Sequence, residues 1–206
     1  MRGVLREISR HTSELCTDVT TPPGISAFAR ARFSPMRFDS RHQVSEDDVD
    51  ALLDAARRAP SAGNSQPWAF IVGRRGDPIH QRLVGHLARS SSAWAPTASL
   101  LLANLSQQLV AGSTLAYSEF ARYDLGQAVA HLTFQAHALG LAVHQFRAFD
   151  RDAIAAEFDV PPHWEVTSMA AVGLPHGPLA THVGSGTSRD RRTTSDITWA
   201  RADTVV

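Results

Sequence analysis

Apolar positions recur at helical spacing in two long segments of the chain. In the first, apolar side chains three or four residues apart predict a helix that Ser45 and Asp48 cap and that ends before Pro60. Its inward positions are Val49, Leu52, Leu53 and Ala56. The second segment predicts the longest helix, over about residues 123–139, with Gly140 in the place of a C-terminal cap. We expect this second helix to be central to the fold.

Short apolar runs predict the strands. They cover residues 68–73, 98–103, 143–147 and 166–172. Two shorter helices are also predicted, one that starts at Pro78 and one that Asp150 caps and that continues through Phe158. A buried strand that follows a helix and a loop favours layered packing of helices on a sheet. The pattern leaves residues 104–117 ambiguous.

The two ends of the chain differ in composition from its middle. The first stretch is polar and closes with the breaker cluster Thr20–Gly24, so we predict an N-terminal extension over residues 1–24. After Gly173 the chain is rich in Gly, Ser, Thr, His and Pro, as in a surface-running tail. In a chain of 206 residues, the remainder is interpreted as a single domain over residues 25–206.

Charge and cysteine content exclude several classes of function. Twenty basic and twenty acidic residues balance, so no overall charge favours a nucleic-acid or acidic-membrane partner. All the basic residues are arginines, which excludes a Schiff-base lysine and leaves guanidinium groups as the cations for any phosphate. Cys16 is the single cysteine, which excludes an internal disulfide. Because no signal-like or membrane-spanning run is present, we expect a cytoplasmic protein without a membrane partner.

Arg32 and Ser34 are the first candidate site residues. They stand in the segment Arg32–Phe38, just ahead of the first capped helix. An arginine and a nearby hydroxyl both donate to phosphate oxygens, so the pair suits a phosphate monoester. By itself, a solvated loop is the commoner meaning of such a cluster, and the same holds for the arginines of the tail, residues 189–192.

The loop over residues 60–68, PSAGNSQPW, is the second candidate. Two prolines make it rigid, and its neutral hydrogen-bonding side chains include Ser61, Asn64 and Gln66. Next to the large ring of Trp68, this set suits a flat polar heterocycle better than a charged group. An ordinary connection between a helix and a strand is the alternative interpretation.

The order of these segments resembles that of the FMN-dependent nitroreductase family. The similarity covers roughly residues 25–199, and its most specific piece is Pro-Ser-x-x-Asn-x-Gln-Pro-Trp after an amphipathic helix. The resemblance implies an α+β fold, a three-layer sandwich in which helices flank a central, mostly antiparallel sheet. It also implies a homodimer that binds FMN in clefts between its two subunits.

The resemblance assigns roles to the candidate residues. Arg32 and Ser34 match positions that hold the FMN phosphate and ribityl chain, and a late arginine joins them. The positions that reach the flavin from the partner subunit are matched by Pro60, Ser61 and Asn64. The full set of expected cofactor-binding residues is Arg32, Phe33, Ser34, Met36, Pro60, Ser61, Asn64, Gln66, Gln145, Phe146, Arg147, Ala148, Arg189 and Arg191. No metal ligand is expected.

In this family, the stretch after the central helix lies against the flavin ring. A backbone amide there points at N5, the atom that accepts and donates hydride. In this chain the stretch is Gln145–Ala148, and Arg147 would supply the amide. We assign no side chain a catalytic role, because the flavin carries the chemistry and the amide acts as a fixed dipole.

Three residues in two segments depart from the family pattern. Met36 stands where a second basic residue is common, near the N1 and O2 edge of the flavin. Arg37 is adjacent, but neighbouring residues in an extended segment point to opposite sides. We therefore expect the anionic reduced flavin to be less favoured. Arg147 and Ala148 replace a Gly-Gly or Glu-Gly pair, and their bulk is expected to narrow the cleft.

Other chemistry-bearing residues are interpreted as structural. His131 and His137 are six residues apart and do not share a helical face, and together with His144 they fit core or surface positions better than a metal site. Asp124 and Glu119 stand near the start of the long helix, where the helix macrodipole accounts for carboxylates. We assign them no catalytic role.

The function that the resemblance implies is hydride transfer by a ping-pong mechanism. NADH or NADPH reduces bound FMN, and a small electron-poor acceptor, such as a nitroaromatic, a quinone or an enone, then takes the hydride. Two alternatives stay open. One is a dehydrogenase or oxidase that acts on a peptide or natural product, and the other is a flavin-binding or storage protein without turnover, which Met36 and the crowded ring stretch favour.

Overall fold

The structure is a computed structural model, and it describes residues 27–177 and 190–202. The chain divides into two compact units, Met1–Ala31 and Arg32–Val206. Helix α2 (Ala27–Ala31) belongs to the first unit, and the elements that follow belong to the second. The predicted extension over residues 1–24 lies outside the described residues.

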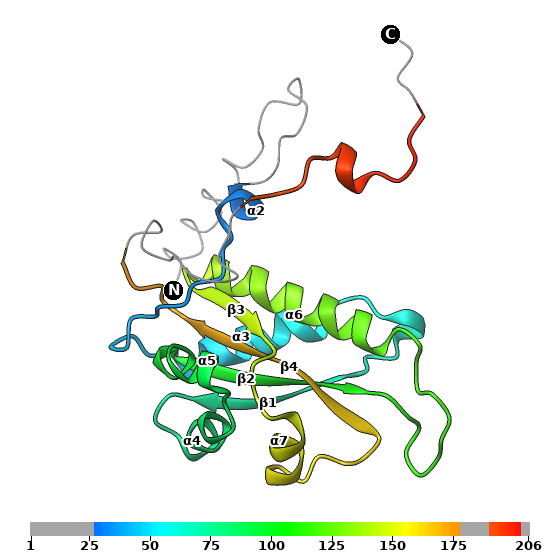
Figure 1. The fold of residues 1–206 in the computed structure, drawn as a ribbon, viewed down its shortest axis with the longest axis horizontal. Helices are drawn as coiled ribbons and strands as arrows, with labels where there is room; N and C mark the ends of the chain where they lie inside the picture. Colours follow the sequence, from blue (N-terminus) through cyan, green and yellow to red (C-terminus); the bar gives the residue numbers. More distant parts are fainter. Residues whose placement is uncertain (1–26, 178–189, 203–206) are drawn as a thin grey trace, which may run out of the picture. The chain divides into compact units, whose positions relative to one another are not determined.

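Four antiparallel strands form the central sheet of the second unit (Figure 1). They are β1 (Trp68–Arg74), β2 (Leu100–Gln107), β3 (Ala142–Phe146) and β4 (Trp164–Gly173). Their order across the sheet is β1-β2-β4-β3, so β1 and β3 are its two edges. The predicted antiparallel sheet is confirmed, and all four strands overlap the predicted apolar runs.

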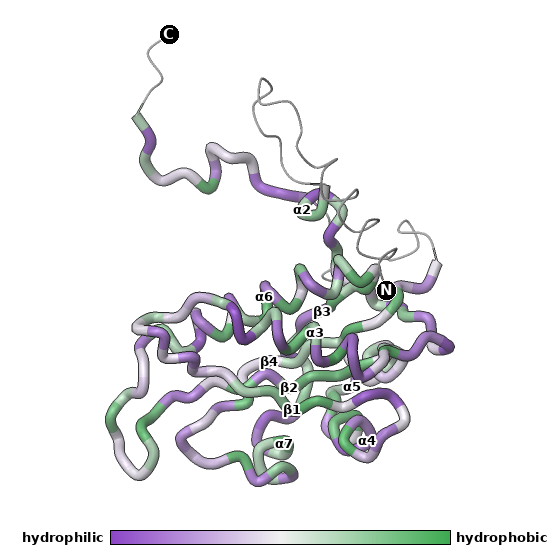
Figure 2. The backbone as a smooth tube through the Cα atoms, turned by 180° about the vertical axis from the view of Figure 1, so that it is seen from behind, coloured by the Kyte–Doolittle hydropathy of each residue, from purple (hydrophilic) through white to green (hydrophobic). Residues whose placement is uncertain are grey.

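Helices cover both faces of this sheet (Figure 1). One layer contains α3 (Glu46–Arg57) and α6 (Ala121–Ala138), and the other contains α4 (Pro78–Gly85), α5 (Arg89–Ser92) and α7 (Arg151–Glu157). Successive side chains of β2 point to opposite faces of the sheet, so this strand contributes to both cores. Leu100 and Leu102 pack toward α3 and α6, while Leu101 packs toward α4 and α7. Apolar residues accordingly concentrate along the strands (Figure 2). The predicted three-layer sandwich is confirmed.

Local capping begins three of these helices. Ser45 and Asp48 form a reciprocal capping box at α3, in which each side chain bonds the other residue's backbone amide. Asp150 accepts a hydrogen bond from the Ala153 amide and caps α7, as predicted. Asp77 caps α4 through the amide of His80, ahead of the predicted Pro78 start.

Three features of the structure were not predicted. Helix α6 begins at Ala121, two residues before the predicted start. Strand β2 continues to Gln107, into the segment that the apolar pattern left ambiguous. Short helical turns, α5 and η2 (Ala95–Thr97), connect α4 to β2. Within residues 27–177 and 190–202, no helix combines the length and the apolar character that crossing a membrane requires.

Candidate functional site

The predicted phosphate segment, Arg32–Phe38, is attached to the chain that follows β4. The Asp39 amide donates to the Leu174 carbonyl at 2.8 Å, and the His176 amide donates to the Arg37 carbonyl at 3.0 Å. These two bonds fix the C-terminal end of the segment to the end of the sheet.

Within this segment, the two predicted phosphate donors lie side by side. Arg32 Nη1 is 3.5 Å from Ser34 Oγ, at the outer limit of a hydrogen bond. Arg32, Phe33 and Ser34 are all half-buried. The structure therefore brings a guanidinium and a hydroxyl together at one place on the surface of the unit.

Strand β3 contacts the same segment through His144. Its Nδ1 lies 2.9 Å from the carbonyl oxygen of Pro35, the residue after Ser34. The imidazole stacks on Trp94, with ring centroids 4.4 Å apart. Burial lowers the pKa of His144 below its ordinary value, while the hydrogen bond to Pro35 acts in the opposite direction.

Met36 and Arg37 line the same hollow on this side of the unit. The hollow has a volume of about 290 Å³, and its lining also includes Trp94 and His176. Met36 is half-buried and packs against the core between the sheet and α4, α5 and α7. Arg37 is exposed, so the two neighbours differ in burial although both border this hollow.

The loop over residues 60–68 is held by its own hydrogen bonds. Ser61 Oγ accepts from the Gln66 amide at 3.0 Å, and the Gln66 side chain donates to the Asn64 carbonyl at 3.3 Å. Gly63, Asn64 and Gln66 have φ of 59°, 55° and 47°. Glycine and asparagine adopt the left-handed region readily, but it costs other residues about 1 kcal/mol or more, so Gln66 is the strained position of this loop.

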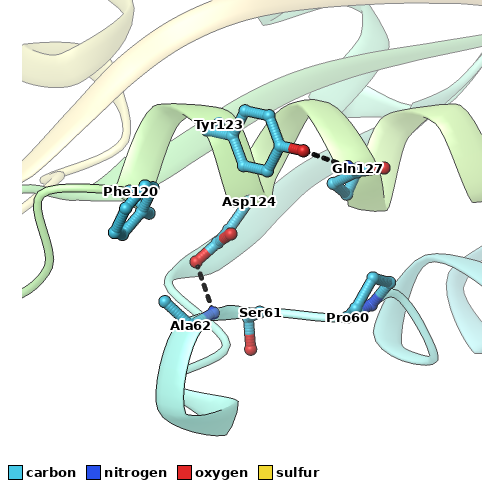
Figure 3. Close-up of a pocket in the computed structure, with 7 residues that line it drawn as sticks. All are labelled: Pro60, Ser61, Ala62, Phe120, Tyr123, Asp124 and Gln127. Atoms are coloured by element: carbon cyan, nitrogen blue, oxygen red, sulfur yellow. Dashed lines mark hydrogen bonds between the residues drawn. The ribbon is translucent and has the colours of Figure 1, made fainter. Parts of the chain in front are cut away.

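Beside this loop, a hollow of about 320 Å³ opens against the first turns of α6 (Figure 3). Its lining consists of Pro60, Ser61, Ala62, Phe120, Tyr123, Asp124 and Gln127. Asp124 is 3 % exposed, and its Oδ2 accepts a hydrogen bond from the Ala62 amide at 3.1 Å (Figure 3). Two aromatic rings with a few polar groups are typical of a small-molecule site.

The stretch Gln145–Ala148 leaves the end of β3 and turns toward the start of α7. Its exposed members are Gln145 and Arg147, and its half-buried members are Phe146 and Ala148. The Ala148 carbonyl accepts a hydrogen bond from the Ala88 amide at 3.1 Å. The Arg147 guanidinium lies 4.8 Å from the centroid of the Phe149 ring, a cation–π arrangement.

Of the two predicted arginines near the C-terminal end, Arg189 and Arg191, the structure describes only the second. Arg189 lies outside the described residues. Arg191 is exposed, and its Nη1 donates to the carbonyl of Asp190 at 2.8 Å. That one of them joins Arg32 at a phosphate stays a prediction.

Two groups of candidate residues belong to opposite edges of the sheet. Segment 32–38 and stretch 145–148 belong to the β3 edge, whereas the loop 60–68 leads into β1. Two strands lie between these edges, and neighbouring strands are about 4.8 Å apart, so the edges are separated by about 14 Å. Within a single copy of the chain, the candidate residues thus fall into two separate groups.

Comparison with known proteins places the chain in a family. The sequence model of the nitroreductase family matches residues 29–103. A 5,6-dimethylbenzimidazole synthase from Rhodospirillum rubrum is 30 % identical over 165 residues, which cover 68 % of this chain and 78 % of that protein. The chain belongs to the nitroreductase family. An Archaeoglobus fulgidus protein with the provisional name NADH dehydrogenase/NAD(P)H nitroreductase is 29 % identical over 149 residues, 68 % of this chain and 79 % of that protein.

Solved structures support the nitroreductase fold. An oxidoreductase whose crystal structure contains FMN aligns with a TM-score of 0.70 and 28 % identity, over 78 % of this chain and 81 % of that one. A nitroreductase family protein from Clostridium difficile 630 aligns with a TM-score of 0.66 and 22 % identity, over 83 % and 94 % of the two chains. The second likeness shows the fold alone.

Asp124 is the site-lining residue of this nitroreductase-family chain whose role the sequence interpretation missed. The macrodipole explanation ignored one signal, since Asp124 is four residues before Ala128 and eight before Leu132, both on the inward face of α6. A carboxylate on an inward stripe requires a hydrogen-bond donor. That donor is an amide of the loop 60–68.

Proposed function

We propose that this chain is an FMN-dependent oxidoreductase that uses NADH or NADPH to reduce a small electron-poor compound such as a nitroaromatic, a quinone or an enone. One observation carries the proposal: the donor pair Arg32 and Ser34 is fixed beside the strand that leads into Gln145–Ala148. That arrangement suits a phosphate at one end and a flat ring at the other. The likeness of the chain to a solved oxidoreductase that contains FMN supports the same cofactor.

The donor groups of the chain fit FMN. Arg32 supplies a fixed positive charge and Ser34 a hydroxyl, and phosphate oxygens accept hydrogen bonds from both. The loop 60–68 exposes the side chain of Asn64, and it contains a buried hydroxyl, Ser65 Oγ, without a hydrogen-bond partner in the part of the chain that the structure describes. An unpaired buried hydroxyl is costly, so a ligand or second subunit that reached it would stabilise the loop.

When bound, FMN supplies hydride transfer at its N5. The chain would hold and orient it, with Arg32 and Ser34 binding the phosphate and the Arg147 backbone amide serving as a donor to N5. A backbone amide is a fixed dipole, so it stabilises developing charge without reorganisation. We assign Phe33, Met36, Gln145, Phe146 and Ala148 to the remainder of the same pocket.

The proposed site is completed by a second copy of the chain. In the proposal, Pro60, Ser61, Asn64 and Gln66 of one subunit reach the flavin that the β3 edge of the partner holds. The 14 Å separation between the two sheet edges supports this, because one copy does not bring both groups to one side. The expected assembly is a homodimer with two equivalent sites.

The outer face of α6 supports this dimer. Tyr123 and Phe134 are 65 % and 50 % exposed, and they are eleven residues apart, which brings them to the same face after three turns. Gln127 and Ala130 lie between them on that stripe. Large apolar side chains in one row on a helix that already buries its other face indicate a covering partner.

Anaerobic reduction of the purified, FMN-loaded protein tests the proposal. We expect NADH or NADPH to bleach the yellow flavin absorbance, and an added quinone or nitroaromatic to restore it. Bleaching only by an organic substrate would support the dehydrogenase alternative, and no bleaching by either would support flavin storage. An Arg32→Gln variant should lose bound FMN, and Arg82→Gln, at an exposed arginine on α4 outside the proposed site, is the matched control.

A further inference from the structure

We propose that His144 is a positioning residue that fixes the phosphate segment against the flavin-facing end of β3. This inference rests on the proposed FMN site and deepens it. His144 lies one residue before Gln145, the first residue of the ring stretch, and it contacts Pro35, the residue after Ser34. One imidazole therefore links the phosphate segment, just after its donor pair, to β3, just before the ring stretch.

The contact with Pro35 has a definite direction. A carbonyl oxygen only accepts, so Nδ1 carries the hydrogen in the 2.9 Å bond. Pro35 is buried, so its carbonyl would lose a hydrogen bond without a compensating water if the imidazole were removed. This bond adds a third attachment of the segment, besides those at Arg37 and Asp39.

Aromatic packing holds the imidazole in place. Trp94 stacks on it with an angle of 28° between the ring planes, and the Phe146 ring meets Trp94 edge-on at 5.1 Å. Trp94 is 7 % exposed and belongs to the core between the sheet and the layer that contains α4 and α7. His144 and Phe146 are two residues apart on β3, so both project to this face of the sheet while Gln145 projects to the other.

The contact made by His144 can be removed without loss of the fold. The β3–β4 ladder and the backbone bonds of Arg37 and Asp39 remain when the imidazole is replaced, so the sheet is expected to persist. What changes is the freedom of Arg32 and Ser34 to shift relative to the ring stretch. A loosened phosphate segment should weaken FMN binding and alter the surroundings of the ring.

Two variants of His144 test the inference. His144→Phe keeps a ring on Trp94 but has no donor, and His144→Asn has an amide donor near the position of Nδ1. Measurements are the Kd for FMN by fluorescence titration, the visible circular dichroism of bound FMN, and the Tm without FMN. We expect the Phe variant to bind FMN about five- to tenfold more weakly with a changed dichroism spectrum, as for one lost hydrogen bond, and the Asn variant to recover most of the affinity.

The control is His86→Phe, because His86 is also half-buried, but its Nε2 lies 3.7 Å from a carboxylate oxygen of Glu157, outside the proposed site. Unchanged affinity and dichroism in the Phe variant would overturn the inference. So would an equal loss of affinity and Tm in both His144 variants, which is the result of a merely structural role. If the wild-type protein binds no FMN, the proposed function itself fails and this inference with it, and that outcome is distinct from the other two.

Discussion

Asp124 in the first turn of α6 holds the loop that precedes β1, through a 3.1 Å hydrogen bond from the amide of Ala62. The two residues are 62 positions apart in the sequence. The carboxylate is 3 % exposed, so water does not replace the loop amide as its partner without local opening. Because the loop is strained at Gln66, this contact helps to maintain a conformation that the chain does not prefer by itself.

Replacement of Asp124 by alanine should therefore loosen the loop. We expect a loss of about 1–3 kcal/mol in the free energy of unfolding, because the Ala62 amide loses a charged partner. Urea unfolding measures this, and hydrogen exchange at residues 61–66 should accelerate. Asp124→Asn keeps an acceptor oxygen and should retain most of the stability. Glu119→Gln, at an exposed acid near the same helix start, is the control; an equal effect there would contradict the assignment.

Gly73 in β1 is expected to tolerate no side chain. A Cβ built there would lie 2.6 Å from the backbone nitrogen and 2.7 Å from the Cα of His80 in α4. Since backbone atoms cannot rotate away, Gly73→Ala must push α4 off the sheet, and overpacking of this kind costs about 1–3 kcal/mol or more. Thermal unfolding checks this. Gly85→Ala, at the end of the same helix, meets no atom within 4 Å and should leave Tm nearly unchanged.

Two buried histidines predict lower stability in mild acid. Burial lowers the pKa of His80 below 6.5, with Asp77 opposing and Arg75 reinforcing the shift, and burial also lowers that of His144. The unfolded chain therefore binds protons first as pH falls, so unfolding becomes easier below about pH 6.5, and above that pH these groups contribute nothing. Urea unfolding between pH 8 and pH 5 measures the slope. A His80→Leu variant should show a smaller slope, and an unchanged slope would refute the assignment to His80.

The sequence predicted elements whose signals are local. The cap at Ser45 and Asp48 and the cap at Asp150 involve partners three residues away, so the pattern contains the whole interaction. The end of β2 was missed because its polar residues are paired across the sheet. Asn104 donates to Ser168 at 3.0 Å, and Ser106 bonds Thr167 at 2.6 Å. These partners are more than sixty residues away, and no periodicity reveals them.

Among the candidate site residues, too, the sequence predicted local contacts and missed long-range ones. Arg32 and Ser34 were found because they lie two residues apart, and the structure brings them together. The contacts of His144 and Asp124 were not predicted, because their partners, Pro35 and Ala62, are distant in sequence. A residue that positions another segment carries little signal in its own neighbourhood, so only the fold identifies it.

The outer face of α6, with the exposed rings of Tyr123 and Phe134, is where we expect the two subunits to meet. If this face is the dimer interface, a charge at Phe134 should separate the subunits, because an interface would have to bury an unpaired carboxylate in place of a ring. Phe134→Glu should weaken dimerisation by about 2 kcal/mol or more, roughly thirtyfold in Kd, as for an interface hot spot. Sedimentation velocity over a range of concentrations measures this, and the same samples should lose FMN as they dissociate. Gln81→Glu adds the same charge to an exposed position on α4, across the sheet, and should remain dimeric.

A Phe134→Glu protein that stays dimeric would place the interface elsewhere, and one that becomes monomeric yet keeps FMN at full affinity would show that a single copy completes the site.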